Sequence, residues 1–264
     1  MSHFKSRFRG LTYKPFLIGN MKCEWIMPDG ADDKRVLLYF HGGGYGAGSI
    51  ETHRAQVSNI VKYSGIKTLV IDYRLAPENK YPAPIEDAVT AYQWLLNEGY
   101  NAKCIGFGGD SAGGGVAIGS VLYLRDYHIQ LPACIIAMSP WLDLTMSGPT
   151  IQSKNGIDPI LVQEGFYIWS AAYLGDADPK APYASPVFQD LTGLPPTYIQ
   201  VGEDEMLLSD STRFAEKAKA DGVNIQIEIY PGMFHVFNAY WRLLPTAKKA
   251  NKKLGEFLRE RLSK

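Results

Sequence analysis

Short apolar runs and amphipathic stretches alternate along most of this chain. The apolar runs have the length of strands that are buried on both faces of a parallel sheet, where helices cover the side chains. We expect such strands at residues 35–40, 68–71, 105–108, 133–138, 197–201 and 225–230. Helical patterns lie at residues 85–96, from 112 toward 125, at 209–221 and at 244–262. This alternation, with short connections, predicts an α/β fold with a doubly wound, mostly parallel sheet flanked by helices.

Two segments do not follow the alternation. Residues 1–34 precede the first clear strand, and residues 143–196 carry a helical pattern at 159–173 but no convincing strand. We expect both segments to contribute to a small helical cap over the sheet. The chain of 264 residues fits one large α/β domain, so the cap would belong to a single domain spanning residues 1–264.

Composition excludes several classes of protein. Lys plus Arg and Asp plus Glu number 27 each, so there is no basic excess to favour nucleic acid. No run of about 18 or more apolar residues is present, and the N-terminal residues lack the apolar core of a secretory signal. The three cysteines show neither metal-binding spacing nor an even count, which fits a reducing compartment. We therefore expect a soluble, cytoplasmic protein with no membrane span and no nucleic-acid partner.

The strand at 105–108 runs directly into a G-x-S-x-G motif at 109–113, centred on Ser111. Such a strand-to-helix turn crowds the serine backbone, and side chains as small as glycine on either side leave room for it. The turn raises the hydroxyl above the sheet, beside the free amides at the start of the following helix. Ser111 is therefore the candidate nucleophile.

A second glycine-rich stretch, HGGG at 41–44, follows the first strand. It lacks the Lys-Ser/Thr ending of a P-loop and the spacing of a dinucleotide site. Three glycines allow backbone amides to approach a substrate oxygen closely. We expect the amides of Gly43 and Gly44, with that of Ala112, to form an oxyanion hole. His41 opens this loop, and we interpret it as structural.

The candidate base is His235, in a loop between the last strand and the C-terminal helix. In this type of fold the nucleophile is followed by the acid and then by the histidine. His128 also follows Ser111, but it lies at the polar end of a helix. The acid should follow the strand at 197–201, which leaves Glu203, Asp204 and Glu205 as candidates.

Together these motifs make the chain resemble the hormone-sensitive-lipase-like esterases, the bacterial family IV group of the α/β-hydrolases. The matching stretches are HGGGY at 41–45, DYRLAPE at 72–78, YPAP at 81–84, GDSAGG at 109–114, SPW at 139–141, and His235. The resemblance implies the α/β-hydrolase fold and a carboxylesterase. In such an enzyme Ser111 attacks an ester carbonyl, His235 moves the proton, and water releases the acyl group. It implies a small-molecule ester substrate and neither a cofactor nor a metal.

The chain departs from this family at the acid. The family usually has Asp-Pro-Leu-Arg-Asp there, whereas this chain has EMLLS at 205–209, preceded by Asp204. Alignment on Leu207 and the count back from His235 put Glu205 in the place of the acid. A glutamate reaches one methylene further, so its loop must sit slightly back from His235. We favour Glu205, with Asp204 as the alternative.

A second departure concerns the cap. Only about 35 residues precede the first clear strand, which is short beside the helical cap of this family. We expect a reduced lid and an open acyl pocket, and therefore hydrolysis of short-to-medium acyl esters. Five aromatic residues are candidates to line that pocket, although aromatic residues at helical spacing more often lie in the core. They are Tyr45, Trp141, Phe166, Tyr167 and Trp169.

Several alternatives stay open. An amidase such as an arylformamidase, a carbohydrate acetyl esterase and a lipase all use the same groups, and the fold does not choose among them. A ligand-binding protein that has lost catalysis is a further alternative, although a serine, a histidine and carboxylates are all present here. Members of this family are often dimers, but the sequence carries no interface signal, which leaves a homodimer open.

Overall fold

The computed structural model describes residues 8–31 and 34–262. Within them, eight strands form one sheet in the order β1-β2-β4-β3-β5-β6-β7-β8. The strands from β3 to β8 are parallel to one another, whereas β1 and β2 are antiparallel additions at one edge. The strands are β1 (Leu11–Ile18), β2 (Met21–Pro28), β3 (Val36–Phe40), β4 (Lys67–Ile71), β5 (Ile105–Asp110), β6 (Cys134–Met138), β7 (Thr197–Gly202) and β8 (Ile225–Tyr230).

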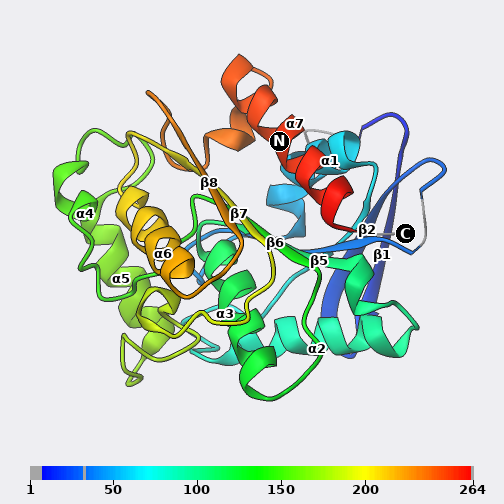
Figure 1. Cartoon of the computed structure of the whole chain (residues 1–264), viewed down its shortest axis with the longest axis horizontal. Coiled ribbons are helices and arrows are strands. Elements are labelled where there is room, and N and C mark those ends of the chain that lie inside the picture. The colour runs from blue at the N-terminus through cyan, green and yellow to red at the C-terminus, as the bar shows by residue number, and fades with distance from the viewer. Residues whose placement is uncertain (1–7, 32–33, 263–264) are drawn as a thin grey trace.

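Helices cover both faces of the sheet, as the alternation predicts (Figure 1). On one face, α1 (Ile50–Ser64) and α7 (Pro245–Arg261) pack together over an apolar cluster that includes Ile60, Leu254 and Leu258. On the other face lie α2 (Ala83–Asn97), α3 (Ala112–Asp126) and α6 (Leu208–Ala220). The two layers bury the central strands completely, which explains why β3 to β7 are mostly apolar.

The prediction of a cap from residues 1–34 is wrong for the part that the structure describes. Leu11–Ile18 and Met21–Pro28 form β1 and β2. Strand β2 pairs antiparallel with β4, and β1 pairs antiparallel with β2 at the edge of the sheet. Polar residues such as Lys14, Lys22 and Glu24 interrupt the apolar positions of the two strands, and Pro15 is accommodated in β1 because β1 is the outermost strand of the sheet. Both features hide these strands from a search for buried apolar runs. Residues 1–7 and 32–33 lie outside the described residues.

Residues 143–196 contain helices and turns but no strand, and all of them are described. The helix expected at 159–173 is present as α5 (Gln163–Leu174), preceded by the short α4 (Thr150–Ser153). Several contacts join this segment to the loop after β7: Lys154 Nζ lies 3.1 Å from the Asp204 carboxylate, the Thr150 hydroxyl donates to the Met206 carbonyl at 2.7 Å, and the amide of Met206 donates to Asp158 at 3.2 Å. None of the helices in the described part of the chain is both long and apolar enough to cross a membrane.

Candidate active site

Ser111 occupies the turn between β5 and α3, with φ 53° and ψ −125°. This backbone conformation is strained for a residue with a side chain, and such strain persists where the surroundings enforce it. The flanking glycines explain how the turn is accommodated. A β-carbon at Gly109 would overlap the backbone of Gly113, and one at Gly113 would overlap the carbonyl oxygen of Phe40. The motif therefore forms the cramped strand-to-helix turn that its spacing predicts.

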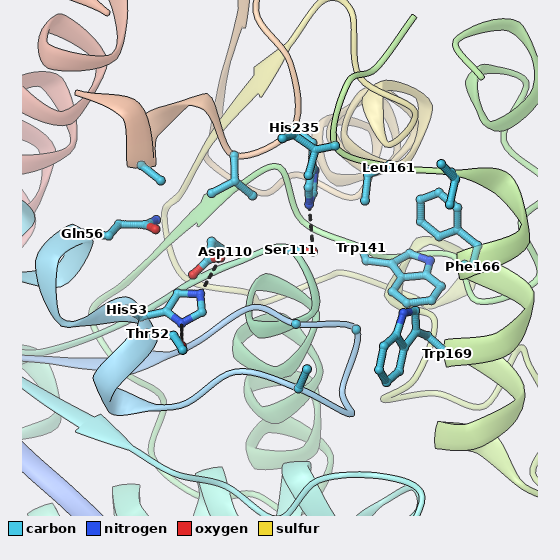
Figure 2. A pocket seen from close by; sticks show the side chains of 18 of the residues that line it. Thr52, His53, Gln56, Asp110, Ser111, Trp141, Leu161, Phe166, Trp169 and His235 are labelled. Carbon is cyan, nitrogen blue, oxygen red and sulfur yellow. Dashed lines mark hydrogen bonds and ion pairs between the residues drawn. The ribbon is translucent and has the colours of Figure 1, made fainter. Parts of the chain in front are cut away.

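His235 lies directly above Ser111, in the loop after β8 (Figure 2). Its Nε2 is 3.0 Å from the Ser111 Oγ, and its Nδ1 is 3.2 Å from Glu205 Oε2. The next residue, Val236, has φ 50°, which is unfavourable for a β-branched side chain. Its amide donates to the Ser139 hydroxyl at 3.0 Å, and this bond holds the loop in place. The structure thus brings a hydroxyl, an imidazole and a carboxylate into one hydrogen-bonded row.

Of the three acid candidates, only Glu205 contacts His235. The Glu205 side chain is fully buried. Asp204 instead pairs with Lys154 at 3.1 Å, and Glu203 accepts from the amide of Gly232 at 3.3 Å in an exposed position. The longer side chain of Glu205 bridges the distance from the loop to the imidazole, as expected for a glutamate at this place.

The environment of Glu205 changes its protonation. Burial raises the pKa of its carboxyl, and the hydrogen bond and charge of His235 offset part of this increase. Ser139 also interacts with this carboxyl and lowers the pKa, although less than His235 does. The carboxylate form of Glu205 is therefore favoured by its two neighbours, His235 and Ser139.

The glycine loop at 42–44 lies beside Ser111. Gly43 has φ 124°, a region reserved for glycine, and a β-carbon there would overlap the carbonyl of Ala47. In the part of the chain that the structure describes, the backbone amides of Gly43, Gly44 and Ala112 donate to no acceptor. Three unused amide donors beside a candidate nucleophile can bind a developing negative charge.

His41 is buried and structural, as interpreted from the sequence. Its ring stacks on Tyr73 with a centroid distance of 4.3 Å, and its Nδ1 lies 2.9 Å from the Gly42 carbonyl. The Tyr73 hydroxyl donates to the His41 carbonyl at 2.6 Å. Burial lowers the pKa of His41 to about 4, so the ring is neutral at physiological pH. These contacts fix the start of the glycine loop.

A cavity of about 470 Å³ opens onto Ser111 and His235. This volume lies in the range of pockets that bind small molecules. Of the five aromatic candidates, Trp141, Phe166 and Trp169 line the cavity (Figure 2). Tyr45 is instead buried and stacks on Tyr173, and Tyr167 points outward with about half of its surface exposed. The segment containing α5 therefore supplies much of the apolar lining.

Four polar residues of the cavity were not identified from the sequence: Thr52, His53, Gln56 and Asp110. Three of them lie on α1, where their spacing is that of an ordinary helix, and Asp110 occupies the variable position of the G-x-S-x-G motif. Their proximity to Ser111 depends on how α1 packs, which no local pattern reveals. Among the described residues, no group of three or more His, Cys, Asp or Glu side chains could hold a metal ion.

This chain is similar to several known hydrolases and esterases. A family model described as the alpha/beta hydrolase fold matches residues 37–239. An acetyl-hydrolase from Streptomyces hygroscopicus is 38% identical over 242 residues, covering 92% of this chain and 81% of that protein. An esterase from Acinetobacter venetianus is 36% identical over 245 residues, covering 92% of this chain and 80% of that protein. A crystal structure of an esterase from the bacterial hormone-sensitive lipase family matches with 41% identity and a TM-score of 0.95, covering 97% of this chain and 86% of that one.

Proposed function

This chain belongs to the α/β-hydrolase fold family, alongside esterases of the bacterial hormone-sensitive lipase family, and from that membership we propose that it is a serine carboxylesterase. The observation that carries the proposal is the row of contacts from Ser111 Oγ to His235 Nε2 and from His235 Nδ1 to Glu205, at 3.0 and 3.2 Å. These distances are within reach of proton transfer between the serine and the imidazole.

The reaction follows from this arrangement. Ser111 Oγ attacks the carbonyl carbon of the ester while His235 Nε2 takes the hydroxyl proton. The resulting oxyanion accepts hydrogen bonds from the amides of Gly43, Gly44 and Ala112, each of which is worth about 3 kcal/mol by analogy with other oxyanion holes. When the C–O bond to the alcohol breaks, His235 returns the proton to the leaving alkoxide, which leaves an acyl group on Ser111.

Water completes the cycle. His235 takes a proton from a water molecule, which attacks the acyl carbonyl, and then returns the proton to the Ser111 oxygen as the carboxylic acid departs. Throughout, the Glu205 carboxylate fixes the imidazole with its proton on Nδ1 and stabilises its charged form. Apart from this water molecule, the groups that act in these steps all belong to the chain or to the ester.

The lining of the cavity also limits the size of the acyl group that can bind. It is bounded on one side by Trp141, Phe166 and Trp169, which favour an apolar chain. Figure 2 shows the three aromatic side chains together on one side of Ser111. We propose short-to-medium acyl esters as substrates, with the rate falling as the acyl chain becomes long.

The test is a panel of p-nitrophenyl esters from acetyl to palmitoyl, run beside aryl amides, formanilides and acetylated sugars. We expect kcat/KM to be highest for acyl chains of about two to six carbons and to fall at least tenfold toward palmitoyl. Hydrolysis of amides or formanilides in preference to every ester would point to the amidase alternative. A hydrolysis rate that rises toward the palmitoyl ester would point to a lipase. The absence of turnover on every substrate would point to a binding protein.

A further inference from the structure

The cavity over Ser111 has two chemically different sides. Figure 2 shows Trp141, Phe166 and Trp169 on one side, and Thr52, His53, Gln56 and Asp110 on the other. We call the second set the polar wall. Three of its residues come from α1, which begins at Ile50 beside the glycine loop. An unsubstituted ester offers only acceptors and apolar groups, so it gives the acceptor atoms of the polar wall no partner.

The orientation of the Gln56 amide follows from its neighbours. The Tyr39 hydroxyl donates to Asp110 Oδ1 at 2.6 Å, so its only proton is used. The Tyr39 oxygen therefore accepts, and Gln56 Nε2 donates to it at 3.3 Å. Nε2 also faces the sulfur of Met138 at 3.7 Å. The other end of the amide is Oε1, which does not contact Tyr39 or Met138. Within the described residues, Oε1 receives no hydrogen bond.

The charge of the polar wall is balanced internally. His53 Nε2 lies 3.4 Å from Asp110 Oδ2, and His53 Nδ1 lies 2.8 Å from Thr52 Oγ1. Burial opposes protonation of His53, but the Asp110 charge outweighs it, and the pKa of the imidazole is raised. Burial likewise opposes ionisation of Asp110, but His53 and Tyr39 outweigh it and lower its pKa. The raised pKa of His53 and the lowered pKa of Asp110 both favour an ion pair between these side chains, and the charges of that pair cancel.

A neutral wall that presents an unused amide oxygen fits a neutral hydrogen-bond donor. We propose that the polar wall binds a hydroxyl group on the alcohol part of the substrate, through Gln56 Oε1. The preferred esters are then monoesters of diols and polyols rather than of simple alkyl alcohols. The aromatic side takes the acyl chain, which leaves the side formed by α1 for the alcohol. This inference rests on the proposed esterase function.

Two substrates of nearly equal shape test the proposal. 2-Hydroxyethyl acetate and propyl acetate differ by one hydroxyl in place of one methyl group. A site that pairs with a hydroxyl disfavours the analogue that lacks it, because its polar atom is then left without a partner. We expect kcat/KM to favour 2-hydroxyethyl acetate by roughly five- to tenfold, the range that one neutral hydrogen bond supplies.

The variant Gln56→Met tests whether the amide causes the preference for 2-hydroxyethyl acetate. Methionine keeps the length of the side chain but has no comparable acceptor. We expect the ratio of the two kcat/KM values to fall close to one. The change Lys62→Met, at an exposed position of the same helix, is the matched control and should leave the ratio as in the unmodified protein. A ratio that is the same in Gln56→Met and in Lys62→Met would overturn the proposal.

A second measurement needs no variant. During hydrolysis of p-nitrophenyl acetate, an added alcohol can replace water: its oxygen attacks the acyl carbon, its proton passes to His235, and the bond to Ser111 breaks. We expect ethylene glycol to capture the acetyl group several times more often than 1-propanol, counted per hydroxyl group. Equal capture of the acetyl group by ethylene glycol and 1-propanol would overturn the polar-wall proposal but not the proposed esterase function. Failure to hydrolyse p-nitrophenyl acetate at all would instead remove the proposed function.

Discussion

We propose Glu205 as the acid at a position where the family that this chain resembles usually has the shorter aspartate. It is fully buried, and its carboxylate meets His235 Nδ1 at 3.2 Å. Its neighbour Asp204 faces away and pairs with Lys154. The two acids are adjacent in sequence but differ completely in environment, so the roles we propose for them can be separated by matched substitutions.

We predict that Glu205→Gln lowers kcat by about 10²- to 10⁴-fold, because an amide no longer fixes the imidazole proton on Nδ1 or stabilises its charged form. Asp204→Asn should change kcat less than about threefold, since it removes only a partly exposed ion pair. Steady-state kinetics of the two purified variants on p-nitrophenyl acetate provide the measurement. The reverse ranking would make Asp204 the acid.

At the scale of elements, a buried amide cluster attaches the His235 loop to two helices. Asn251 of α7 donates to Asn59 of α1 at 2.8 Å and to the carbonyl of Asn238 at 3.0 Å. Asn238, three residues beyond His235, donates to Asn251 and to Gln200 of β7. The catalytic loop we propose is therefore held by side chains from opposite ends of the chain.

Removal of this cluster should affect both stability and turnover. We predict that Asn251→Ala lowers the free energy of unfolding by about 2–4 kcal/mol, because buried groups of Asn59 and Asn238 lose their partner. Lys252→Ala, at the exposed neighbouring position, is the control and should change it by less than about 0.5 kcal/mol. Denaturant unfolding measures both, and equal values for the two variants would contradict the structural role of the cluster.

A second element, α5, limits the aromatic side of the cavity. The Trp169 ring packs against Gly44 and Gly46 of the glycine loop, where a β-carbon would overlap it. We predict that Trp169→Ala raises the ratio of kcat/KM for octanoyl over acetyl esters by roughly tenfold, since the vacated space accepts more methylenes. Tyr167→Ala, on the outer surface of the same helix, should leave this ratio unchanged. An unchanged ratio in Trp169→Ala would place the acyl chain elsewhere.

At the scale of the whole molecule, one buried acid links the stability of the fold to pH. Asp210 of α6 accepts from the amides of Leu142 and Asp143 at 2.9 Å each, and it joins α6 to the loop after β6. Burial and the neighbouring Asp143 raise the pKa of Asp210 well above its ordinary value. The folded state therefore binds this proton more tightly than the unfolded state does.

The sign of the effect follows from this linkage. Stability from Asp210 is present below the pKa of the unfolded chain, about 4, and is lost as pH rises through the higher folded pKa. We predict that Asp210→Asn, compared with the unmodified protein, gains several degrees in Tm between pH 5 and pH 8. The exposed Asp176→Asn should show no such gain. Thermal unfolding of both proteins at pH 5 and pH 8 provides the measurement. A difference in Tm between Asp210→Asn and the unmodified protein that is the same at both pH values would contradict the prediction.

The central sheet and the row of reactive groups could be predicted from the sequence because their signals are local. Apolar runs mark strands with two covered faces, and the turn at Ser111 needs small neighbours. The strands β1 and β2 were missed because polar residues and Pro15 interrupt their apolar positions, so they do not form continuous apolar runs. Gln56 and His53 were missed for a different reason: their environment is made by Tyr39 and Asp110, which belong to other elements and meet them only when α1 packs on the sheet.

The central claim is that Ser111 acts as the nucleophile. Incubation with a fluorophosphonate, followed by peptide mass spectrometry, tests it most directly. The account predicts a single covalent adduct on the peptide that carries Ser111, no adduct in Ser111→Ala, and labelling slowed by at least about a hundredfold in His235→Ala. An adduct on a different residue, or an unmodified Ser111 in a protein that still hydrolyses esters in the presence of the probe, would contradict it.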